Sequence, residues 1–461
     1  MSELDLPSRA RKPRLLSWGR LCSPLHFVLP MEQSALKSNY ANARRCFLKG
    51  LGALLAHSAY VPHAYGDAPA SRNSKVQYGQ ETLPIGVRSR FVDNNNGLRM
   101  HVLEAGFEGG KRPCCVLLHG FPELGYTWRH QLLPLAAAGF HVVAPDLRGY
   151  GKSAAQPVIF SDDLGPYQML NRVADVLGLV RALGYDHVDT VIGHDWGAPT
   201  AAWCALVRPD VFRSVVLMST PFGGPSTLPF DSANRHVPHS AEVDIPKELA
   251  ALPHPRKHFW WVYAGPGANE DMWHAPQGVH DLLRALYYYK SAGWPQNKPF
   301  RLKSWAAVEL AKMPTYYIMN VDQGIAETMA ANMPSAEQIA ACHWMSEKDL
   351  QVYSTEFTRT GFQGGLNSYR ILTGQGTFDE LNAFSGRTID VPALFIGGAS
   401  EWGPRQSPGA LEAMRSGACT RLMGVHFVDK AGHSIPEEQP EQVNQLLIEF
   451  LHRSRSAPAR T

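Results

Sequence analysis

Residues 191–198 read VIGHDWGA, and this stretch decides the fold. An apolar strand runs into a Gly-x-Asp-x-Gly turn and then into a helical segment, which is the strand–elbow–helix pattern that presents a nucleophile. Small residues on either side allow the sharp turn that raises the central side chain above the sheet. Asp195 stands at that place, and its carboxylate can attack a saturated carbon to form an ester that water later hydrolyses. Taken alone, the turn could equally hold a structural Asp at a helix N-terminus.

Short β-rich runs alternate with longer amphipathic segments from about Val87 onward. This alternation predicts the α/β class, with a mostly parallel central sheet flanked by helices. We expect strands at 100–104, 114–118, 141–144, 190–192, 214–218, 393–396 and 425–429, and helices such as 167–183 and 442–451.

A long insertion separates the predicted strands at 214–218 and 393–396. It is crowded with Trp, Tyr, His and Pro, as in the stretch HFWWVY at 258–263, and it is expected to be mostly helical with long loops. An insertion between two strands of the core sheet indicates a lid. Such a lid would lie over the carboxyl ends of the strands, where these sheets bind ligands. We therefore expect a core formed by residues 84–222 and 386–455, and a lid, or cap, domain at 223–385.

A second motif lies upstream, where residues 116–123 read VLLHGFPE. A buried strand ends there in a turn of the H-G-x-P type, two strands before the elbow. In folds with such a nucleophile elbow, this turn supplies a backbone N–H, here that of Phe121. Together with the N–H of Trp196 it is expected to form an oxyanion hole. A plain turn at a strand end would also tolerate Gly and Pro, but it would not explain this position.

Two further polar residues each follow a late predicted strand. Glu401 comes soon after 393–396, and His433 comes after 425–429. The chain order of nucleophile, acid and His is the order that this fold uses. A neutral imidazole can take a proton from water near pH 7, and a carboxylate on its other nitrogen fixes the tautomer. We therefore expect His433 to be the base and Glu401 to be the acid that orients it.

With these motifs, the chain resembles the epoxide hydrolases of the α/β-hydrolase superfamily from about residue 84 to 451. Two stretches in the lid add to the resemblance. Residues 314–327 (PTYYIMNVDQGIAE) resemble the stretch with the family's first ring-opening tyrosine, which aligns with Tyr316 or, shifted by one, with Tyr317. Residues 364–370 (GGLNSYR) resemble the stretch with the second, which aligns with Tyr369. Two neutral phenols, with an unperturbed pKa near about 10, can bind and protonate an opening epoxide oxygen.

The resemblance implies an epoxide hydrolase with the α/β-hydrolase fold, which forms a diol through a covalent ester on Asp195. His433 would activate the water that hydrolyses the ester, with Glu401 standing where the family usually has Asp. No metal and no organic cofactor is implied, and the aromatic lid points to an apolar or aromatic epoxide as the small-molecule partner. The particular epoxide, the regio- and stereoselectivity and the oligomeric state stay open.

Two alternatives stay open at this point. A haloalkane or haloacetate dehalogenase shares the Asp-Trp elbow and the His, and a Trp-rich lid could supply the donors that bind halide. The second alternative is a non-catalytic ligand-binding protein, because the same fold can serve unrelated functions.

Residues 146–153 read DLRGYGKS and resemble a turn that is common across α/β-hydrolases. We interpret this turn as structural, with Asp146 and Arg148 paired to each other rather than involved in catalysis.

The first 66 residues are expected to be an extension with a twin-arginine-type export signal. Arg44-Arg45 precedes a mildly apolar run at 50–61 and then small residues. That run is too short to span a bilayer, and Ala43 stands where the signal usually has Ser or Thr. Such a signal predicts contact with the twin-arginine export machinery and a periplasmic or secreted location. An ordinary basic helix is the alternative, and the cleavage site and the start codon, Met1 or Met31, stay open.

The composition excludes some other classes of protein. The 461 residues are 44% hydrophobic and 18% charged, as in a globular protein. Part of the net charge of +3 lies in residues 1–50, and no basic stripe follows, so nucleic-acid binding is disfavoured. The seven cysteines show neither metal-ligand spacing nor a disulfide framework.

Overall fold

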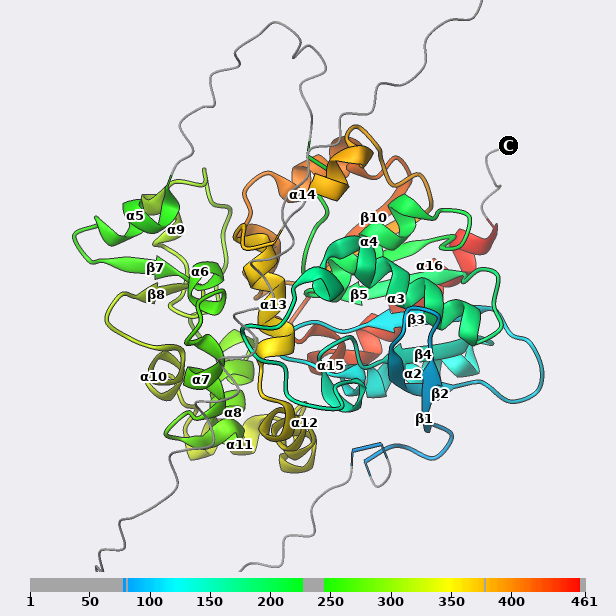
Figure 1. Ribbon diagram of the computed structural model, residues 1–461, viewed down its shortest axis with the longest axis horizontal. Coiled ribbons are helices and arrows are strands. Elements are labelled where there is room, and N and C mark those ends of the chain that lie inside the picture. Colours follow the sequence, from blue (N-terminus) through cyan, green and yellow to red (C-terminus); the bar gives the residue numbers. More distant parts are fainter. Residues whose placement is uncertain (1–77, 80–81, 227–243, 377–378, 457–461) are drawn as a thin grey trace, which may run out of the picture. The chain divides into compact units, whose positions relative to one another are not determined.

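The computed structural model describes residues 78–79, 82–226, 244–376 and 379–456. The expected N-terminal extension at 1–66, with its export signal, lies outside these residues. Eight strands form one sheet in the order β1-β2-β4-β3-β5-β6-β9-β10 (Figure 1). Their bounds are β1 Arg88–Asp93, β2 Arg99–Ala105, β3 Cys114–Leu118, β4 His141–Pro145, β5 Thr190–His194, β6 Val215–Met218, β9 Ala393–Gly398 and β10 Leu422–Val428.

The sheet is mostly parallel, which confirms the predicted class. Only β1 with β2 and β2 with β4 pair antiparallel, and the other neighbours in the eight-stranded sheet are parallel. Every residue of β3, β4, β5 and β6 is buried, as expected for parallel strands covered on both faces. The edge strand β1 was not predicted, because Val92 is its only buried residue.

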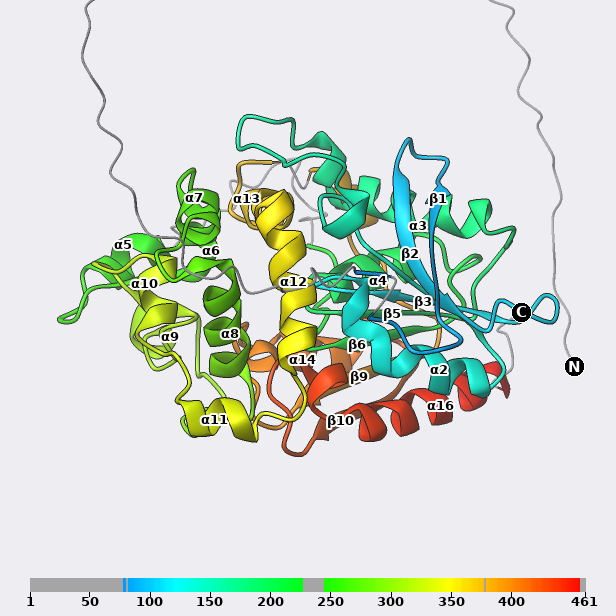
Figure 2. The same ribbon diagram turned by 90° about the horizontal axis from the view of Figure 1, so that it is seen from below.

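Alternate residues of the central strands enter two separate cores. In β3, Cys115 and Leu117 join one cluster, whereas Cys114, Val116 and Leu118 join the other, as the two-residue period of a strand requires. Helices α2 (Arg129–Ala137) and α16 (Pro440–Ser456) pack into the first cluster, and α3 (Met169–Ala182) and α4 (Gly197–Val207) into the second. Figure 2 shows α2 and α16 together on one side of the strands.

The chain leaves the sheet after β6 and returns to it at β9. The intervening part, called the insertion below (residues 244–372 of the described chain), is mostly helical, as predicted. Its helices are α5 Ile245–Ala250, α6 Phe259–Tyr263, α7 Ala268–Trp273, α8 Gly278–Lys290, α9 Ala307–Leu310, α10 Ile325–Ala330, α11 Ala336–Ala341, α12 Glu347–Thr360 and α13 Gln363–Leu372. A small antiparallel pair, β7 (Arg256–His258) with β8 (Ile318–Asn320), was not predicted.

Helices α12 and α13 lie between the rest of the insertion and the sheet in both views (Figure 1 and Figure 2). Two short helices complete the core: α14 (Ala410–Ala413) follows β9, and α15 (Ile435–Glu438) follows β10. The carboxyl ends of β5, β6, β9 and β10 therefore meet at one edge of the sheet, where the chain continues into the elbow, the insertion and the loops that carry the candidate residues.

The predicted pairing of Asp146 with Arg148 is wrong. Asp146 is buried and accepts hydrogen bonds from the backbone N–H of Gly125, at 2.9 Å, and lies 2.8 Å from His101 Nδ1. Arg148 instead pairs with Asp175 of α3, at 2.6 Å. Both residues hold structure, but each does so with a partner that is remote in the sequence.

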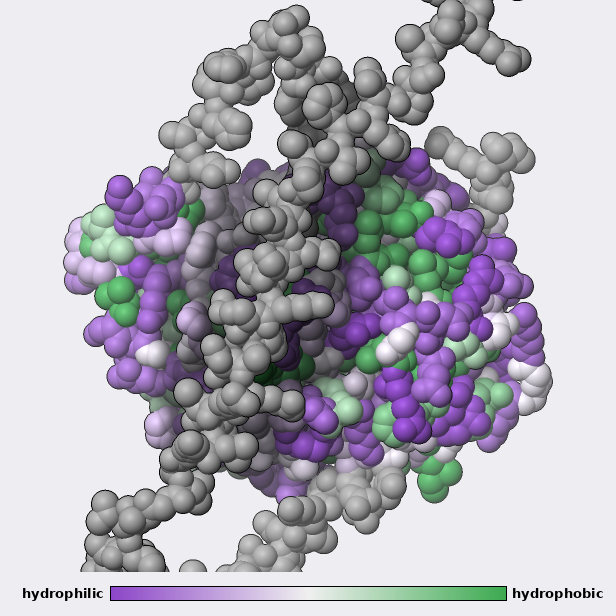
Figure 3. Space-filling view, in the orientation of Figure 1, coloured by the Kyte–Doolittle hydropathy of each residue, from purple (hydrophilic) through white to green (hydrophobic). Residues whose placement is uncertain are grey.

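The face drawn in Figure 3 is mainly hydrophilic, and hydrophobic residues gather on it chiefly around α4. None of the helices in the described part of the chain combines the length and the apolar character that crossing a bilayer requires.

Candidate active site

Asp195 occupies the elbow between β5 and α4 that the sequence predicts. Its φ of 48° lies in the left-handed region, which is uncommon for a residue with a side chain and typical of this turn. The turn needs its glycines, because a Cβ at position 120 would overlap the Asp195 side chain and one at 197 would overlap the carbonyl oxygen of Leu118. The tight turn thus holds the carboxylate at the edge of the sheet.

One carboxylate oxygen of Asp195 is already held. Oδ1 accepts a hydrogen bond from the N–H of Phe121 at 2.9 Å, so the predicted oxyanion donor does face this carboxylate. Within the described chain, the N–H of Trp196, the second predicted donor, makes no hydrogen bond to the Asp195 side chain. Oδ2 is therefore the oxygen that stays available for other chemistry.

His433 and Glu401 lie beside this free oxygen. His433 Nε2 is 3.5 Å from Asp195 Oδ2, and His433 Nδ1 is 2.8 Å from Glu401 Oε1. Both side chains are buried. Ser219, which directly follows β6, donates to Glu401 and lies 3.2 Å from His433 Nδ1. The sequence reading missed Ser219, although its place at the end of a central strand could have drawn attention to it.

Burial, and then the Lys290 ammonium, lowers the pKa of His433 from its ordinary value. The imidazole is therefore neutral at pH 7. Its Nε2, on the side of Asp195, has no hydrogen-bond partner among the described residues. A neutral nitrogen without a partner, held 3.5 Å from a carboxylate, is able to take a proton from a water molecule there.

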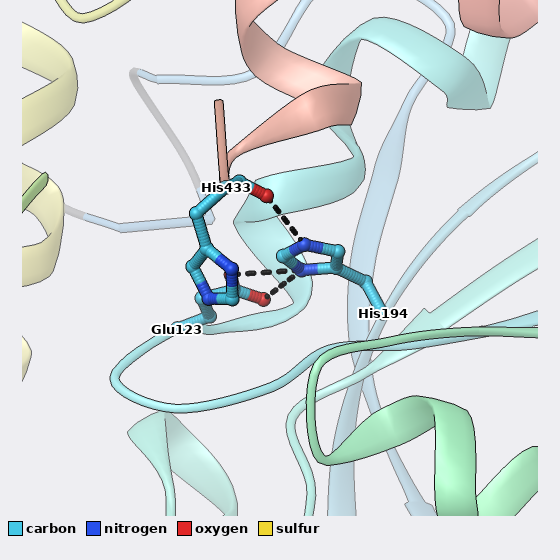
Figure 4. Close-up of side chains that lie close together, drawn as sticks. All are labelled: Glu123, His194 and His433. Carbon is cyan, nitrogen blue, oxygen red and sulfur yellow. Dashed lines mark hydrogen bonds and ion pairs between the residues drawn. The ribbon is translucent and has the colours of Figure 1, made fainter. Parts of the chain in front are cut away.

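A second buried pair supports His433 from behind (Figure 4). His194 Nδ1 lies 2.9 Å from Glu123 Oε1, and His194 Nε2 donates to the carbonyl oxygen of His433 at 2.7 Å. Burial opposes charge here, but Glu123 raises the pKa of His194 to about 9, and His194 in turn lowers the pKa of Glu123 to about 2. The pair is an imidazolium and a carboxylate, and it holds the main chain at His433.

Glu123, His194 and His433 lie close enough together to share a metal ion. A protonated His194 has no lone pair to offer, because both of its nitrogens carry donated hydrogens. The chemistry of this cluster therefore suits an ion pair better than a metal centre. Glu123 lies in the stretch VLLHGFPE and His194 in the stretch VIGHDWGA, but neither motif predicts this pair.

A small aromatic cavity lies between the insertion and the loop that contains Phe121, whose N–H binds Asp195. It is lined by Phe121, Pro122, Phe259, Tyr263, Leu286, Lys290, Tyr316, Tyr317 and Tyr369. Tyr369 comes from α13, and its ring meets the Trp196 ring edge-on at 5.2 Å between centroids. Burial, and then the Asp195 carboxylate, raises the pKa of Tyr369 well above its ordinary value. This phenol therefore stays protonated near the Asp195 carboxylate.

The hydroxyl of Tyr316 is bound within the insertion. Its hydroxyl donates to Asn297 Oδ1 at 2.8 Å, and its ring packs edge-on against Tyr289 at 4.7 Å between centroids. No interaction joins it to Asp195 in the part of the chain that the structure describes.

Tyr317 is the next residue of the same turn and directly precedes β8. Its ring packs on Phe259 at 4.9 Å between centroids. Burial is the main cause that raises the pKa of Tyr317, and Asp195 and Tyr369 are among the neighbours that add to it. Of the two tyrosines that the motif left open, the geometry favours Tyr317 over Tyr316.

Two other residues of this cavity were not predicted. Tyr263 of α6 has its ring centroid 5.1 Å from that of Tyr369, and burial raises its pKa, with Asp195 among the contributing charges. Lys290, at the end of α8, brings a cation to the same cavity. Nothing in the sequence separates these two from the many other tyrosines and lysines of the insertion.

Comparison with known proteins agrees with this arrangement. The model of the α/β-hydrolase fold family matches residues 115–243. Epoxide hydrolase B of Mycobacterium tuberculosis is 31% identical over 377 residues, which cover 78% of this chain and 96% of that protein. Epoxide hydrolase 2 of Siraitia grosvenorii is 30% identical over 365 residues, covering 78% and 97%.

Solved structures give the same answer. An epoxide hydrolase from an endophytic Streptomyces shares 33% identity and a TM-score of 0.64, over 81% of this chain and 98% of that one. Epoxide hydrolase A from Mycobacterium thermoresistibile shares 30% identity and a TM-score of 0.58, over 81% and 100%. The relatives named here are epoxide hydrolases, which favours this family over the dehalogenases. The chain therefore belongs to the epoxide hydrolase family of the α/β-hydrolase superfamily.

Proposed function

We propose that this epoxide hydrolase opens an epoxide to a diol through a covalent ester on Asp195, which water activated by His433 then hydrolyses. The observation that carries the proposal is the placement of a neutral imidazole nitrogen 3.5 Å from Asp195 Oδ2, with Glu401 on its other side. A nucleophile beside its own base suits a reaction in which the ester must later be cleaved.

Ring opening begins with Asp195 Oδ2, since the Phe121 N–H holds Oδ1. The lone pair of Oδ2 forms a bond to a ring carbon, and the carbon–oxygen bond of the epoxide breaks with its electron pair moving to the oxygen. Tyr369 and Tyr317 bind this oxygen, and one of them transfers its phenolic proton to it. Burial keeps both phenols protonated until then, so they can act as acids.

Hydrolysis of the ester is the second step. His433 Nε2 takes a proton from water, and the resulting hydroxide attacks the ester carbonyl carbon while Glu401 stabilises the imidazolium. The oxyanion that forms accepts a hydrogen bond from the N–H of Phe121, and the N–H of Trp196 is the second donor. The bond from the Asp195 carbonyl carbon to the diol oxygen then breaks, and that oxygen takes the proton from His433. The proton that came with the hydroxide leaves the Asp195 carboxyl group and restores the tyrosine that gave up its own. Glu401 reaches Nδ1 at 2.8 Å, which supports Glu in place of the usual Asp.

The lining of the cavity supports an apolar or aromatic epoxide as the substrate. Phe259 and Leu286 supply apolar surface, and the tyrosine rings supply flat faces on which an aryl group can pack. We propose that the insertion serves as the lid and that the substrate binds between it and the elbow.

The test is turnover by the purified chain with a panel of epoxides and haloalkanes. Diol formation from an aryl or alkyl epoxide is expected, and Asp195→Asn should abolish it, because a neutral amide is a poor nucleophile. Release of halide from a haloalkane, with no diol from any epoxide, would instead support the dehalogenase alternative.

We also propose that the enzyme is periplasmic or secreted, exported by the twin-arginine machinery. The support is the sequence pattern alone: Arg44-Arg45 before a mildly apolar run at 50–61. Replacing both arginines by Lys should leave the chain in the cytoplasmic fraction, whereas the natural chain should be found outside it, with an N-terminus that lies beyond the apolar run at 50–61. Export of the double variant at the natural level would refute the proposal.

A further inference from the structure

Lys290 is a cation in the cavity that the proposed mechanism leaves unused. It is the last residue of α8, and it lines the cavity together with Tyr317 and Tyr369. Its Nζ lies 5.7 Å from the centroid of the Tyr317 ring. Across the described residues, no hydrogen bond and no ion pair within 4 Å engages this ammonium. A cation held in a cavity without a fixed anionic partner is expensive unless a charge in the site compensates it.

The main chain fixes Lys290 beside the catalytic loop. Its carbonyl oxygen accepts the N–H of His433 at 3.0 Å, and a Cβ at Gly432 would lie 2.5 Å from that same oxygen. The buried Glu438 carboxylate adds a second tie, because it accepts the N–H of Ala292 at 2.8 Å and that of Gly432 at 2.9 Å. The end of α8 is therefore joined to the loop that carries the base, so the ammonium has a defined place in the site.

The carboxylates near Lys290 indicate which negative charge its ammonium can compensate. Burial lowers the pKa of Lys290, and the carboxylates of Asp195, Glu401 and Glu123 oppose that shift, Asp195 most strongly. Glu123 already has His194 as its cation, at 2.9 Å. Glu401 already has His433, at 2.8 Å. Asp195 is the carboxylate whose charge changes during the reaction, because ester formation makes it neutral.

Ring opening moves one negative charge from Asp195 to the epoxide oxygen. Lys290 belongs to the insertion, on the side of the two phenols, whereas Asp195 belongs to the sheet. The charge therefore moves toward the ammonium as the ring opens. Because burial raises the pKa of Tyr317 and of Tyr369, these phenols are weaker acids than in water, and charge stays on the oxygen until proton transfer is complete.

We propose that Lys290 is the counter-ion of the epoxide oxygen and stabilises the alkoxide that forms on it. The inference rests on the proposed function, and it adds a third, cationic group to the two phenols. A fixed charge in a site that excludes water acts strongly on a charge that develops nearby, and it needs no reorganisation to do so.

The experiment compares Lys290→Met, which removes the charge, with Lys290→Arg, which keeps it. Lys298→Met is the matched control, since Lys298 is exposed and lies eight residues further along the chain. Single-turnover rapid quench measures the rate of ester formation on Asp195. We expect Lys290→Met to slow it by at least about tenfold, or about 1.4 kcal/mol. Lys290→Arg should stay within about threefold of the natural chain, and the control should be unchanged.

A second readout separates this role from a structural one. Each variant is measured with epoxybutane and with trifluoromethyl oxirane, whose alkoxide is much less basic. The loss in Lys290→Met should be clearly smaller for the trifluoromethyl compound, because its alkoxide needs less stabilisation. This ratio does not depend on how much of the variant is folded.

Ester formation that is equally fast or faster in Lys290→Met would overturn the inference, as would an equal loss with both epoxides. A natural chain that forms no ester with any epoxide would overturn the proposed function, and the inference with it. The two failures are therefore distinguishable.

Discussion

Removing the hydroxyl of Tyr317 should slow ester formation, whereas removing that of Tyr316 should lower the stability of the fold. Tyr317→Phe deletes a phenol on the Asp195 side of the cavity, whereas Tyr316→Phe deletes one whose hydroxyl donates to Asn297 at 2.8 Å. Both changes leave a ring of the same shape in the same turn before β8. The pair therefore isolates the effect of a hydroxyl from the effect of packing.

The magnitude follows from what each hydroxyl binds. A hydrogen bond to a charged group contributes about 1.5–3 kcal/mol, so losing the bond from Tyr317 to the alkoxide should slow ester formation by about 10- to 150-fold. Tyr316→Phe leaves a buried acceptor on Asn297 without its donor, which should lower the free energy of unfolding by about 1–3 kcal/mol. Its rate of ester formation should stay within about threefold of the natural chain.

Stopped-flow fluorescence with styrene oxide in excess can follow ester formation, since Trp196 lies next to the reacting carboxylate in the chain. Urea unfolding of the same samples gives the change in stability. The reasoning would be refuted if Tyr316→Phe slowed ester formation as much as Tyr317→Phe, or if Tyr317→Phe left the rate unaltered.

Two further predictions test the turn and the buried ion pair. Gly120→Ala should slow ester formation by about 100-fold or more, because a Cβ there overlaps the Asp195 side chain. Gly267 has open space around it, so Gly267→Ala should leave the rate unchanged. Equal rates of the two variants in a single-turnover assay would contradict this prediction. The pKa of His194 is raised from 6.5 to about 9 in the folded chain, so its contribution to stability is complete below pH 6.5 and is lost as the pH rises to 9. Glu123→Gln should reduce this pH dependence of the free energy of unfolding, which is at most about 1.4 kcal/mol per pH unit. An unaltered pH dependence of the urea midpoint would contradict the prediction.

The fold could be predicted because its central strands are buried on both faces. Such strands appear as continuous apolar runs, for example 114–118 and 190–192, and each predicted strand is present within a few residues at either end. The edge strand β1 shows no such run, because most of its side chains are exposed or half-buried. The β7–β8 pair, three residues in each strand, is too short to give a periodic signal.

The proximity of the candidate nucleophile, acid and base could be predicted because each follows a strand of the parallel sheet. Carboxyl ends of parallel strands meet at one edge, so chain position alone brings Asp195, Glu401 and His433 together. The choice between Tyr316 and Tyr317 could not be predicted. It depends on tertiary contacts, because Asn297 binds the hydroxyl of Tyr316 whereas the ring of Tyr317 packs on Phe259.

Lys290 shows a further limit of the sequence. A basic residue in the last turn of a helix is ordinary, because it is favourable at the negative end of the helix dipole and is usually solvated. Its burial depends on contact between the end of α8 and the loop at His433, which are far apart in the chain. Only the packing of the insertion on the sheet makes it a residue of the site.

Trapping the ester tests the central claim most directly. His433→Gln keeps a polar side chain but lacks the base, so Asp195 should still attack the epoxide while hydrolysis stops. Incubation with styrene oxide should then add one substrate molecule per chain, and mass spectrometry of the digested protein should find it on the peptide that contains Asp195. A folded His433→Gln chain with an unmodified Asp195, or with undiminished diol formation, would contradict the account.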